Sequence, residues 1–217
     1  MHITVFGASG GVGSRTVLEA VRRGHRVRAV SRDAAKLTGL PSEVEVWAGD
    51  VSDADQVAAA SADTDLVISA TRPVVGREHE LAEVATALLE GLGQKGTRLL
   101  VVGGAGSLTV AGTGKTVVEQ PDFPADWKPI AHACNDQLAV FEQAAQQPDG
   151  GAVDWAYLSP AAMLEPGERT GTYRLGADEL IADDEGNSAI SMEDLAVALL
   201  DEAERPKHHR VRFTVGY

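Results

Sequence analysis

The sequence predicts an α/β fold: a doubly wound parallel sheet with a small C-terminal α+β elaboration. Three observations predict it. Short apolar runs typical of buried strands alternate with helical patterns as far as Pro160. A glycine-rich turn, GASGGVG over residues 7–13, joins the first such run to the first helical pattern. After Pro160 the pattern changes to short strands with polar turns before one last helix and strand.

The first third of the chain supplies four predicted strands, over residues 3–6, 27–31, 44–47 and 65–70. The helix after the first strand carries three apolar residues on one face and is ended by Gly24; these residues are Val17, Leu18 and Val21. After the third strand, Ser52-x-x-Asp55 has the spacing of a capping box that opens a short alanine-rich helix.

The middle of the chain continues the alternation. A helix ending at Gly93 is predicted from apolar residues at helical spacing, which are Leu81, Val84, Ala85, Leu88, Leu89 and Leu92. A strand over 98–103, a helix over 131–146 and a strand over 152–158 follow. Strands that alternate with helices in this way imply parallel pairing through right-handed crossovers.

The segment over residues 161–217 is too short for an independent domain. It contains predicted strands over 172–175, 180–183, 188–190 and 210–215, and a helix capped by Ser191 with apolar residues at Met192, Leu195, Ala196, Leu199 and Ala203. We therefore expect one domain over residues 1–217, with 161–217 forming a flank on the substrate side.

Composition narrows the classes of partner. A formal net charge of −13 opposes binding to nucleic acid or to anionic membranes. No apolar run approaches the roughly 18 residues of a membrane span. Because the sequence goes straight from Met1 into a predicted strand, we expect no secretory signal. The single cysteine, Cys134, excludes an internal disulfide and a cysteine-rich metal cluster. We expect a cytoplasmic protein with a small-molecule partner and no metal, either a monomer or a homodimer.

The glycine turn predicts a dinucleotide site. Gly7, Gly10 and Gly13 lie between a strand and a helix, in a unit of about 30 residues that ends with a second strand. There, glycines permit a tight turn, close approach of the pyrophosphate and packing of the helix on the strand, and the helix N-terminus favours the anion. We predict that Gly7, Ala8, Ser9, Gly10, Gly11, Val12 and Gly13 bind the cofactor; the alternative is a purely structural turn.

The end of the second strand favours NADP(H) over NAD(H). A small polar residue followed by a cation, Ser31-Arg32, suits the 2′-phosphate. Asp33 keeps NAD possible, although it could equally begin the next helix. Other predicted cofactor contacts lie after the third and fourth strands, at Asp50, Val51, Ser69, Ala70 and Thr71; for Asp50 the alternative is a role in its own turn.

Catalytic residues are harder to predict. The Gly-x-x-Gly-x-x-Gly spacing resembles extended and atypical short-chain dehydrogenases/reductases, which usually protonate a carbonyl with the tyrosine of Tyr-x-x-x-Lys. That motif is absent, since Ala161 and Ala177 lie four residues after Tyr157 and Tyr173. Ser107 and His132 are the remaining candidates for catalysis, and for each a surface or turn role is the alternative. Gly103, Gly104 and Pro160 are predicted to line the nicotinamide side.

Six segments resemble one family along the whole chain: GASGGVG, VRAVSRDAAKL, AGDVSD, LLVVGGAGSL, DWAYLSPAAMLEPGERTGTYRLG and RVRFTVGY. They resemble the NAD(P)H-binding atypical short-chain dehydrogenases of the NmrA-like group, in the branch named for NADH-flavin reductases and similar to biliverdin reductase B. The resemblance implies a Rossmann fold and a ring-like acceptor over residues 104–107 and Pro160. Residues 165–169 are then a candidate acceptor-side loop or a charged turn.

Three functions stay open at this point. The first is an NADPH-dependent reductase of a flavin, a quinone or a similar conjugated acceptor, which needs no dedicated protein acid. The second is a non-catalytic regulator that senses the redox state of NADP(H). The third is a small-molecule epimerase or isomerase, which the absence of Tyr-x-x-x-Lys opposes.

Overall fold

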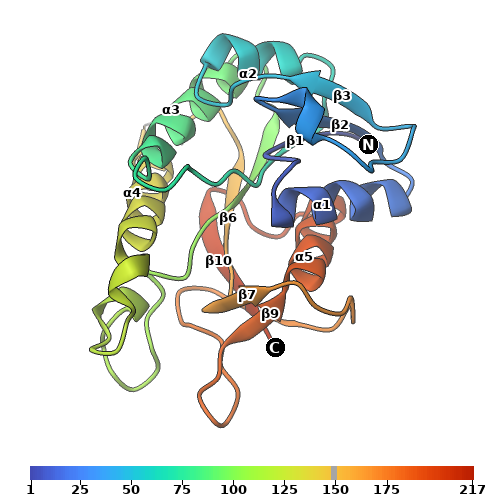
Figure 1. Ribbon diagram of the computed structural model, residues 1–217. Coiled ribbons are helices and arrows are strands. Elements are labelled where there is room, and N and C mark those ends of the chain that lie inside the picture. The colour runs from blue at the N-terminus through green and yellow to red at the C-terminus, as the bar shows by residue number, and fades with distance from the viewer. Residues whose placement is uncertain (148–150) are drawn as a thin grey trace.

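A computed structural model of the chain describes residues 1–147 and 151–217. Its centre is an eight-stranded sheet in the order β3-β2-β1-β4-β5-β6-β10-β8 (Figure 1). The strands of this sheet are β1 (His2–Phe6), β2 (Arg26–Ser31), β3 (Glu45–Ala48), β4 (Leu66–Ser69), β5 (Arg98–Val102), β6 (Trp155–Ser159), β8 (Arg174–Gly176) and β10 (Val211–Gly216). Every pairing is parallel except that of β8 with β10. A separate parallel pair is formed by β7 (Met163–Glu165) and β9 (Ala189–Ser191).

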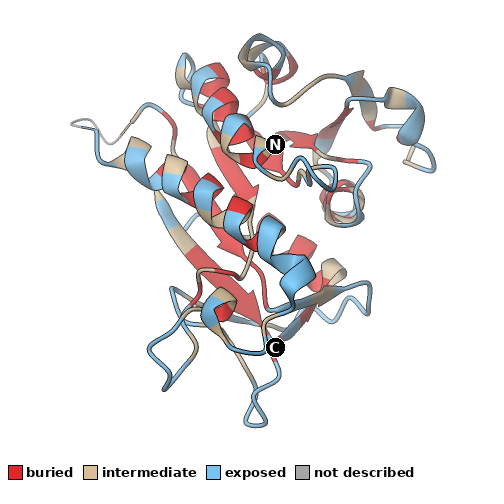
Figure 2. Cartoon of the chain, turned by 60° about the vertical axis from the view of Figure 1, so that its left-hand side comes forward, coloured by how far each residue is buried: buried red, intermediate tan, exposed pale blue. Residues whose placement is uncertain are grey.

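Helices cover both faces of the sheet. One face carries α1 (Gly11–Arg22) and α5 (Met192–Glu204), and the other carries α2 (Ala54–Ala60), α3 (Glu80–Gly93) and α4 (Lys128–Ala145). Short 3₁₀ turns are η1 (Ala34–Lys36), η2 (Val117–Glu119) and η3 (Ala125–Trp127). Figure 2 shows buried strands between helices whose outer surfaces are exposed. The predicted doubly wound α/β fold is therefore confirmed.

Strand alternation divides the core into two clusters. In β5, Leu100 packs in the cluster beneath α1 and α5, whereas Leu99 and Val101 pack in the cluster beneath α2, α3 and α4. This follows from the period of two in a strand, because successive side chains point to opposite faces. Both faces of the central strands are thus buried, as parallel sheets require.

The strand order changes direction between β1 and β4. From β1 the chain proceeds through β2 to β3 on one side, and then returns to place β4 on the other side of β1. Loops leaving the carboxyl ends of β1 and β4 therefore run in opposite directions, and ligands of doubly wound sheets bind at such a switch point. The glycine turn follows β1 and lies at this point.

Two local expectations in the first third of the chain are wrong. The N-cap of α2 is Asp53, whose carboxylate accepts from the N–H groups of Asp55 and Gln56. Ser52 cannot serve because its hydroxyl donates to Asp50. On α1, Val17 is fully buried but Leu18 is 46% exposed, because adjacent helical residues point about 100° apart.

The C-terminal segment also differs in detail. Residues 180–183 form no strand, and β7, which the sequence does not predict, pairs with β9. Strand β6 begins three residues later than expected, at Trp155. Ser191 caps α5 as predicted, accepting from the Asp194 N–H at 2.9 Å. Residues 161–217 supply β8, β10 and α5 to the central layers; that they border a substrate stays a prediction.

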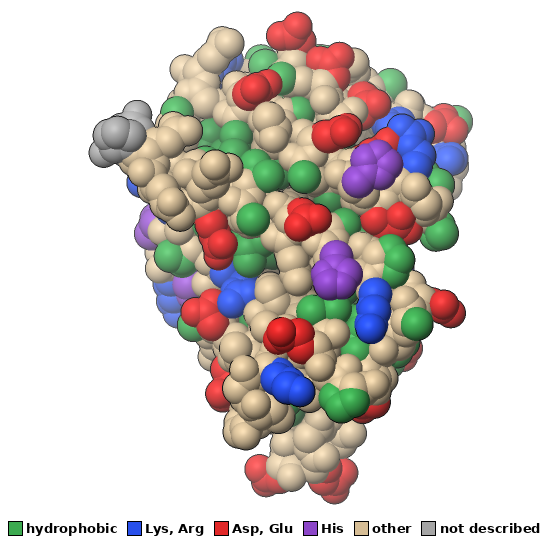
Figure 3. Space-filling view, turned by 90° about the vertical axis from the view of Figure 1, so that its left-hand side faces the viewer, with side chains coloured by type: hydrophobic (Ala, Val, Ile, Leu, Met, Phe, Trp, Pro, Cys, Tyr) green, Lys and Arg blue, Asp and Glu red, His purple; other side chains and the backbone are tan. Residues whose placement is uncertain are grey.

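The chain has a formal net charge of −13. On the face that carries α3 and α4, carboxylate side chains are spread among neutral ones, and basic and histidine side chains lie among them (Figure 3). Within the described residues, no helix combines the length and the apolarity that crossing a bilayer demands.

Candidate functional site

The glycine turn after β1 is shaped by backbone contacts that only glycine permits. Gly7 has a φ of +76°, and a Cβ there would lie 2.7 Å from the carbonyl carbon of Ala70. A Cβ on Gly13 would lie 2.7 Å from the carbonyl carbon of Gly7 and closer still to its oxygen. The turn is closed by the Gly10 N–H, which donates to Gly7 O at 2.9 Å. Two of the three glycines therefore allow the first turn of α1 to lie directly against β1 and the end of β4.

The N-terminus of α1 is left open toward an anion. Gly10 is the N-cap, and among the described side chains none caps this end. The first N–H groups of a helix have no partner within the helix, so those of residues 11–13 can donate to a ligand oxygen. A glycine turn that leads into an uncapped helix is the arrangement that binds phosphate groups. The residues therefore fit the pyrophosphate of a dinucleotide.

The end of β2 lies beside the glycine turn. Ser9 Oγ and Ser31 Oγ are 3.2 Å apart, and Ser31 Oγ also accepts from the Asp33 N–H at 3.3 Å. The Asp33 carboxylate accepts from the Ala35 N–H and caps η1. Arg32 is exposed, and no partner is found for its guanidinium among the residues described. Of the two candidates for the ribose, the arginine is free to reach a ligand, whereas one oxygen of the aspartate is engaged in its own turn.

Two further predicted contact regions differ in their surroundings. The Asp50 carboxylate accepts from both the N–H and the hydroxyl of Ser52, so it stabilises the turn after β3, while Val51 packs partly against the core. After β4, Ser69 Oγ and Thr71 Oγ1 are 3.3 Å apart. The Ala70 N–H donates to the carbonyl of Phe6 on β1, beside the glycine turn.

The loop after β5 is packed tightly on Tyr157 and α4. A Cβ on Gly103 would overlap the ring of Tyr157, and one on Gly104 would lie 3.0 Å from Cys134 Sγ. Tyr157 is fully buried and donates its hydroxyl to the carbonyl of Cys134 at 2.9 Å. Burial raises the pKa of Tyr157 well above its ordinary value, and it likewise raises the pKa of the Cys134 thiol to about 11. Gly103 and Gly104 thus have a packing reason to be glycine, whatever else they contact.

Ser107, at the end of this loop, is bound by a residue that the sequence analysis missed. Arg212 of β10 donates from Nη1 to Ser107 Oγ at 2.7 Å, and its Nε and Nη2 both donate to Asp178 Oδ1. The sequence carried a weak signal, because Arg212 and Thr214 alternate with Phe213 and Val215 in the last strand. That pattern predicts a polar face but not its partner.

Within the described part of the chain, no hydrogen bond joins His132 or the two other tyrosines to this loop. His132 is exposed on α4, whereas the neighbouring Ala131 and Ala133 are buried. Tyr173 donates to the Asp201 carboxylate, and burial together with this bond raises the pKa of Tyr173. The Tyr217 hydroxyl bonds to Ser191 and Asp194 at the start of α5. Each of the three tyrosines in the chain has its hydroxyl engaged within the protein.

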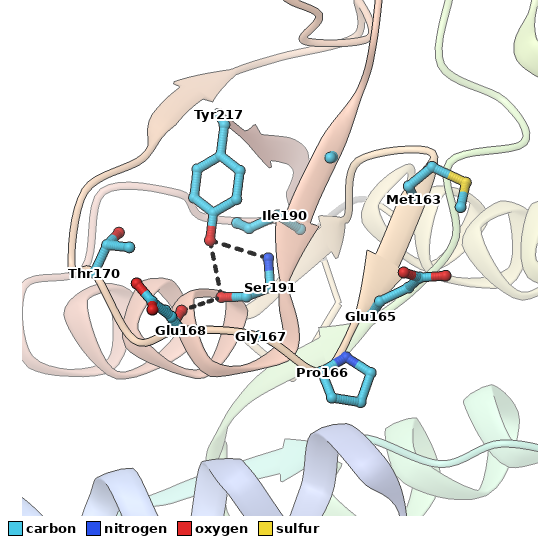
Figure 4. Close-up of a pocket in the computed structure, with 10 residues that line it drawn as sticks. Met163, Glu165, Pro166, Gly167, Glu168, Thr170, Ile190, Ser191 and Tyr217 are labelled. Carbon is cyan, nitrogen blue, oxygen red and sulfur yellow. Dashed lines mark hydrogen bonds between the residues drawn. The ribbon is translucent and has the colours of Figure 1, made fainter.

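Beyond β6, the candidate acceptor-side loop borders an open pocket. Pro160 is buried directly after β6. A pocket of about 340 Å³ lies between residues 163–170, β9 and Tyr217, with Glu165 and Glu168 among its lining side chains (Figure 4). Arg169 leaves this pocket and binds Glu19 of α1 through two hydrogen bonds, at 2.8 and 3.0 Å. One part of the loop therefore lines a cavity and the other fastens it to α1.

Comparison with known proteins agrees with this geometry. A model of an NAD(P)H-binding family matches residues 7–206. YwnB, an uncharacterised protein of Bacillus subtilis, is 40% identical over 99% of this chain and 98% of its own. A solved structure from Bacteroides thetaiotaomicron, described as a candidate epimerase, is 40% identical with a TM-score of 0.88 and covers 100% of this chain and 96% of its own. Another from Streptococcus pneumoniae, described as a candidate NADH-flavin reductase, is 31% identical with a TM-score of 0.86, covering 100% and 99%.

Proposed function

Because the chain belongs to the NAD(P)H-binding family, in agreement with its resemblance to atypical short-chain dehydrogenases/reductases, we propose that it is a cytoplasmic NADPH-dependent reductase. Its acceptor is a flavin, a quinone or a similar small conjugated molecule. The relative from Streptococcus pneumoniae, described as a candidate NADH-flavin reductase, supports this class of acceptor. When bound, the reduced nicotinamide supplies a hydride to an electron-poor ring.

The residues that would hold the cofactor lie along the carboxyl ends of β1, β2 and β4. The uncapped N-terminus of α1 offers its N–H groups to the pyrophosphate, and Gly7 and Gly13 keep the approach clear of side chains. Ser69, Ala70 and Thr71 border the same turn, since Ala70 is hydrogen bonded to β1.

NADPH is favoured over NADH by the state of two side chains. Arg32 is exposed with a free guanidinium, and guanidinium pairs strongly with phosphate. The Asp33 carboxylate, which would bind the ribose hydroxyls of NAD, already caps η1. Replacing Arg32 by Ala should weaken NADPH binding by about tenfold or more and leave NADH binding nearly unchanged, a difference of about 1.4 kcal/mol. Equal losses for both cofactors would contradict the phosphate-pairing role.

The hydrogen bonding of the tyrosine hydroxyls favours a flavin or quinone reductase over a tyrosine-dependent enzyme. An alcohol dehydrogenase or an epimerase of this superfamily depends on a tyrosine acid, but Tyr157 is buried and donates to a backbone carbonyl. Reduction of a flavin or quinone needs no such acid, because the reduced ring is stabilised and takes its proton from solvent. The 40% identical relative described as a candidate epimerase favours the rival reaction, and the engaged tyrosines oppose it.

The test is steady-state oxidation of NADPH with riboflavin, FMN and a panel of quinones. We expect oxidation well above the rate in buffer with at least one acceptor. Tight NADPH binding without oxidation of NADPH by any acceptor would overturn the reductase proposal and favour the redox-sensing regulator. In that case, a protein partner that co-purifies only in one redox state of the cofactor would identify the regulator.

A further inference from the structure

We propose that Arg212 is a positioning residue for the acceptor site: it binds the oxygen of Ser107, so that the Ser107 hydroxyl donates its hydrogen to a neutral carbonyl or ring nitrogen of the acceptor. The inference rests on the reductase function proposed above. Neither Arg212 nor its partner Asp178 belongs to the glycine turn or to any dinucleotide motif in the sequence.

The first observation is the direction of the hydrogen bond. Arg212 Nη1 donates to Ser107 Oγ at 2.7 Å, and the Arg212 side chain is only 11% exposed. A hydroxyl has one hydrogen to donate and two lone pairs that accept. Once its oxygen accepts from a guanidinium, the hydroxyl is polarised and its hydrogen remains for another acceptor. None of the described residues accepts a hydrogen bond from the Ser107 hydroxyl.

The second observation is that Arg212 is held on two sides. Its Nε donates to Asp178 Oδ1 at 2.9 Å and its Nη2 to the same oxygen at 2.5 Å. The backbone of Asp178 is in turn fixed to the loop that carries Ser107, because both the N–H and the hydroxyl of Thr109 donate to the Asp178 carbonyl, at 2.8 and 3.0 Å. Serine, arginine and aspartate thus form a closed arrangement that limits rotation of the Ser107 side chain.

The same contacts indicate the chemistry of the acceptor. The Asp178 carboxylate, which is 71% exposed, pairs with the Arg212 guanidinium and offsets part of its positive charge. An anionic group on the acceptor is therefore not required at this point. The group that suits an oriented neutral hydroxyl is a neutral hydrogen-bond acceptor, such as the carbonyl oxygen or the ring nitrogen of a conjugated heterocycle or quinone. As negative charge develops on that atom, a donor already in place stabilises it.

A third, independent observation places unpaired polar groups beside Arg212. Ser159 and Thr214 are fully buried, and their hydroxyls have no hydrogen-bond partner in the described part of the chain. The two residues are paired in register at the carboxyl ends of β6 and β10. By strand alternation Thr214 faces the same side as Arg212, because Phe213, which separates them, and Val215, which follows, both pack in the cluster beneath α1 and α5. A buried hydroxyl without a partner is destabilising, and an internal water or a ligand group can supply the missing hydrogen bond.

The test compares Ser107→Ala, Arg212→Ala, Arg212→Lys and the Ser107→Ala/Arg212→Ala double variant, with Arg26→Ala as the matched control. Arg26 lies at the start of β2 and is 64% exposed, so we expect Arg26→Ala to leave both kcat and riboflavin binding unchanged. Two readouts are used. One is kcat for NADPH oxidation with riboflavin and menadione, and the other is riboflavin binding to the protein saturated with NADP⁺, followed by quenching of riboflavin fluorescence.

We expect Ser107→Ala and Arg212→Ala each to lower kcat by about tenfold to a hundredfold, with NADPH affinity unchanged. The double variant should be no worse than either single variant, because Arg212 acts through Ser107. Arg212→Lys should recover part of the rate, since an ammonium can still donate to the serine. If Arg212→Ala does not fold, Asp178→Asn replaces it, because this variant keeps the arginine but loosens its fixation.

Three results would overturn the inference. The first is a kcat for Arg212→Ala equal to that of the unaltered protein, and the second is a loss of kcat in the double variant equal to the product of the two single losses. The third applies if the protein does not oxidise NADPH with any acceptor: riboflavin binding that none of the variants changes. The two proposals fail separately. If the unaltered protein oxidises NADPH with no acceptor, but Ser107→Ala and Arg212→Ala weaken riboflavin binding equally, the reductase function fails and the positioning role stands. If riboflavin neither binds nor is reduced, and menadione is not reduced, both fail.

Discussion

The substitution Gly13→Ala tests whether the glycine turn holds a cofactor through close backbone contact. A Cβ at residue 13 would lie 2.7 Å from the carbonyl carbon of Gly7 and 3.0 Å from Ala8 Cα, and it would lie closer still to the Gly7 oxygen. All three atoms belong to the backbone, so no side-chain rotation relieves the overlap. The first turn of α1 must therefore move away from β1, and the N–H groups of residues 11–13 move with it.

Two opposing terms set the magnitude for Gly13→Ala. Overpacking of this kind typically costs about 1 to 3 kcal/mol, and the better helix propensity of alanine returns up to about 1 kcal/mol. We expect a net loss of about 1 to 2 kcal/mol in the free energy of unfolding. For a chain of this size, each kcal/mol lowers the Tm by about 2 to 4 °C. NADPH affinity should fall by about tenfold or more, since in the proposed binding mode the displaced N–H groups donate to the pyrophosphate.

The assay is thermal unfolding with and without NADPH, together with a fluorescence titration of NADPH. At a concentration of about 100 times its Kd, NADPH should stabilise the unaltered protein by about 2.7 kcal/mol, and Gly13→Ala should lose most of this gain. The matched control is Gly93→Ala at the end of α3, where a Cβ meets only Ala152 Cβ at an ordinary 3.6 Å. Unchanged NADPH binding by a Gly13→Ala variant of undiminished Tm would refute the reasoning.

Three further predictions concern groups outside the glycine turn. Tyr157→Phe should leave kcat/KM for NADPH oxidation unchanged, because the hydroxyl is buried on a carbonyl, and should lower the free energy of unfolding in urea by about 1 kcal/mol; a large loss of turnover would restore tyrosine catalysis. Burial raises the pKa of the Cys134 thiol from 9.0 to about 11, so at pH 8 iodoacetamide should alkylate the native protein far more slowly than the denatured protein, as read by mass spectrometry. Between pH 9 and 11 the unfolded chain releases this proton more readily, so the contribution of Cys134 to stability is constant below that range and falls as the pH rises through it. Glu19 is 5% exposed and accepts from Arg22, Arg23 and Arg169, so Glu19→Gln should cost about 1 to 3 kcal/mol, whereas Arg169→Ala, at a half-exposed position, should cost about 0 to 1 kcal/mol; equal losses in urea unfolding would contradict this difference.

The features predicted correctly from the sequence are those in which the residue favoured by the local pattern also fits its tertiary contacts. The need for glycine at residues 7 and 13 can be predicted because the strand-to-helix turn leaves no room for a Cβ at either position. The alternation of strands and helices can be predicted because each central strand is buried on both faces and is therefore a near-continuous apolar run. Ser191 was recognisable as a cap because its partner, the Asp194 N–H, lies within the same turn of helix.

The features that sequence reasoning missed depend on partners far along the chain. Arg212 and Ser107 are 105 residues apart, and no local pattern links them. Strand β7 has three residues and exists only through its pairing with β9. The N-cap of α2 is Asp53 and not the predicted Ser52, because the Ser52 hydroxyl donates to a third residue, Asp50. Both cap residues are acceptable locally, so the competing contact decides between them.

The contacts of α5 join the C-terminal segment directly to the glycine turn. Met192 Sδ lies 3.0 Å from the position that a Cβ on Gly11 would occupy. The next residue, Glu193, accepts from Arg15 of α1 with one oxygen and from the Gly167 N–H with the other. The first turns of α1 and α5 and the loop that lines the pocket are thus joined directly. If the acceptor lies against that loop, Glu193 connects the loop to the first turn of α1 through these two hydrogen bonds. The reductase proposed above, which has no tyrosine acid, would depend on such fixed positioning, because the orientation of the two rings is most of what the protein can contribute.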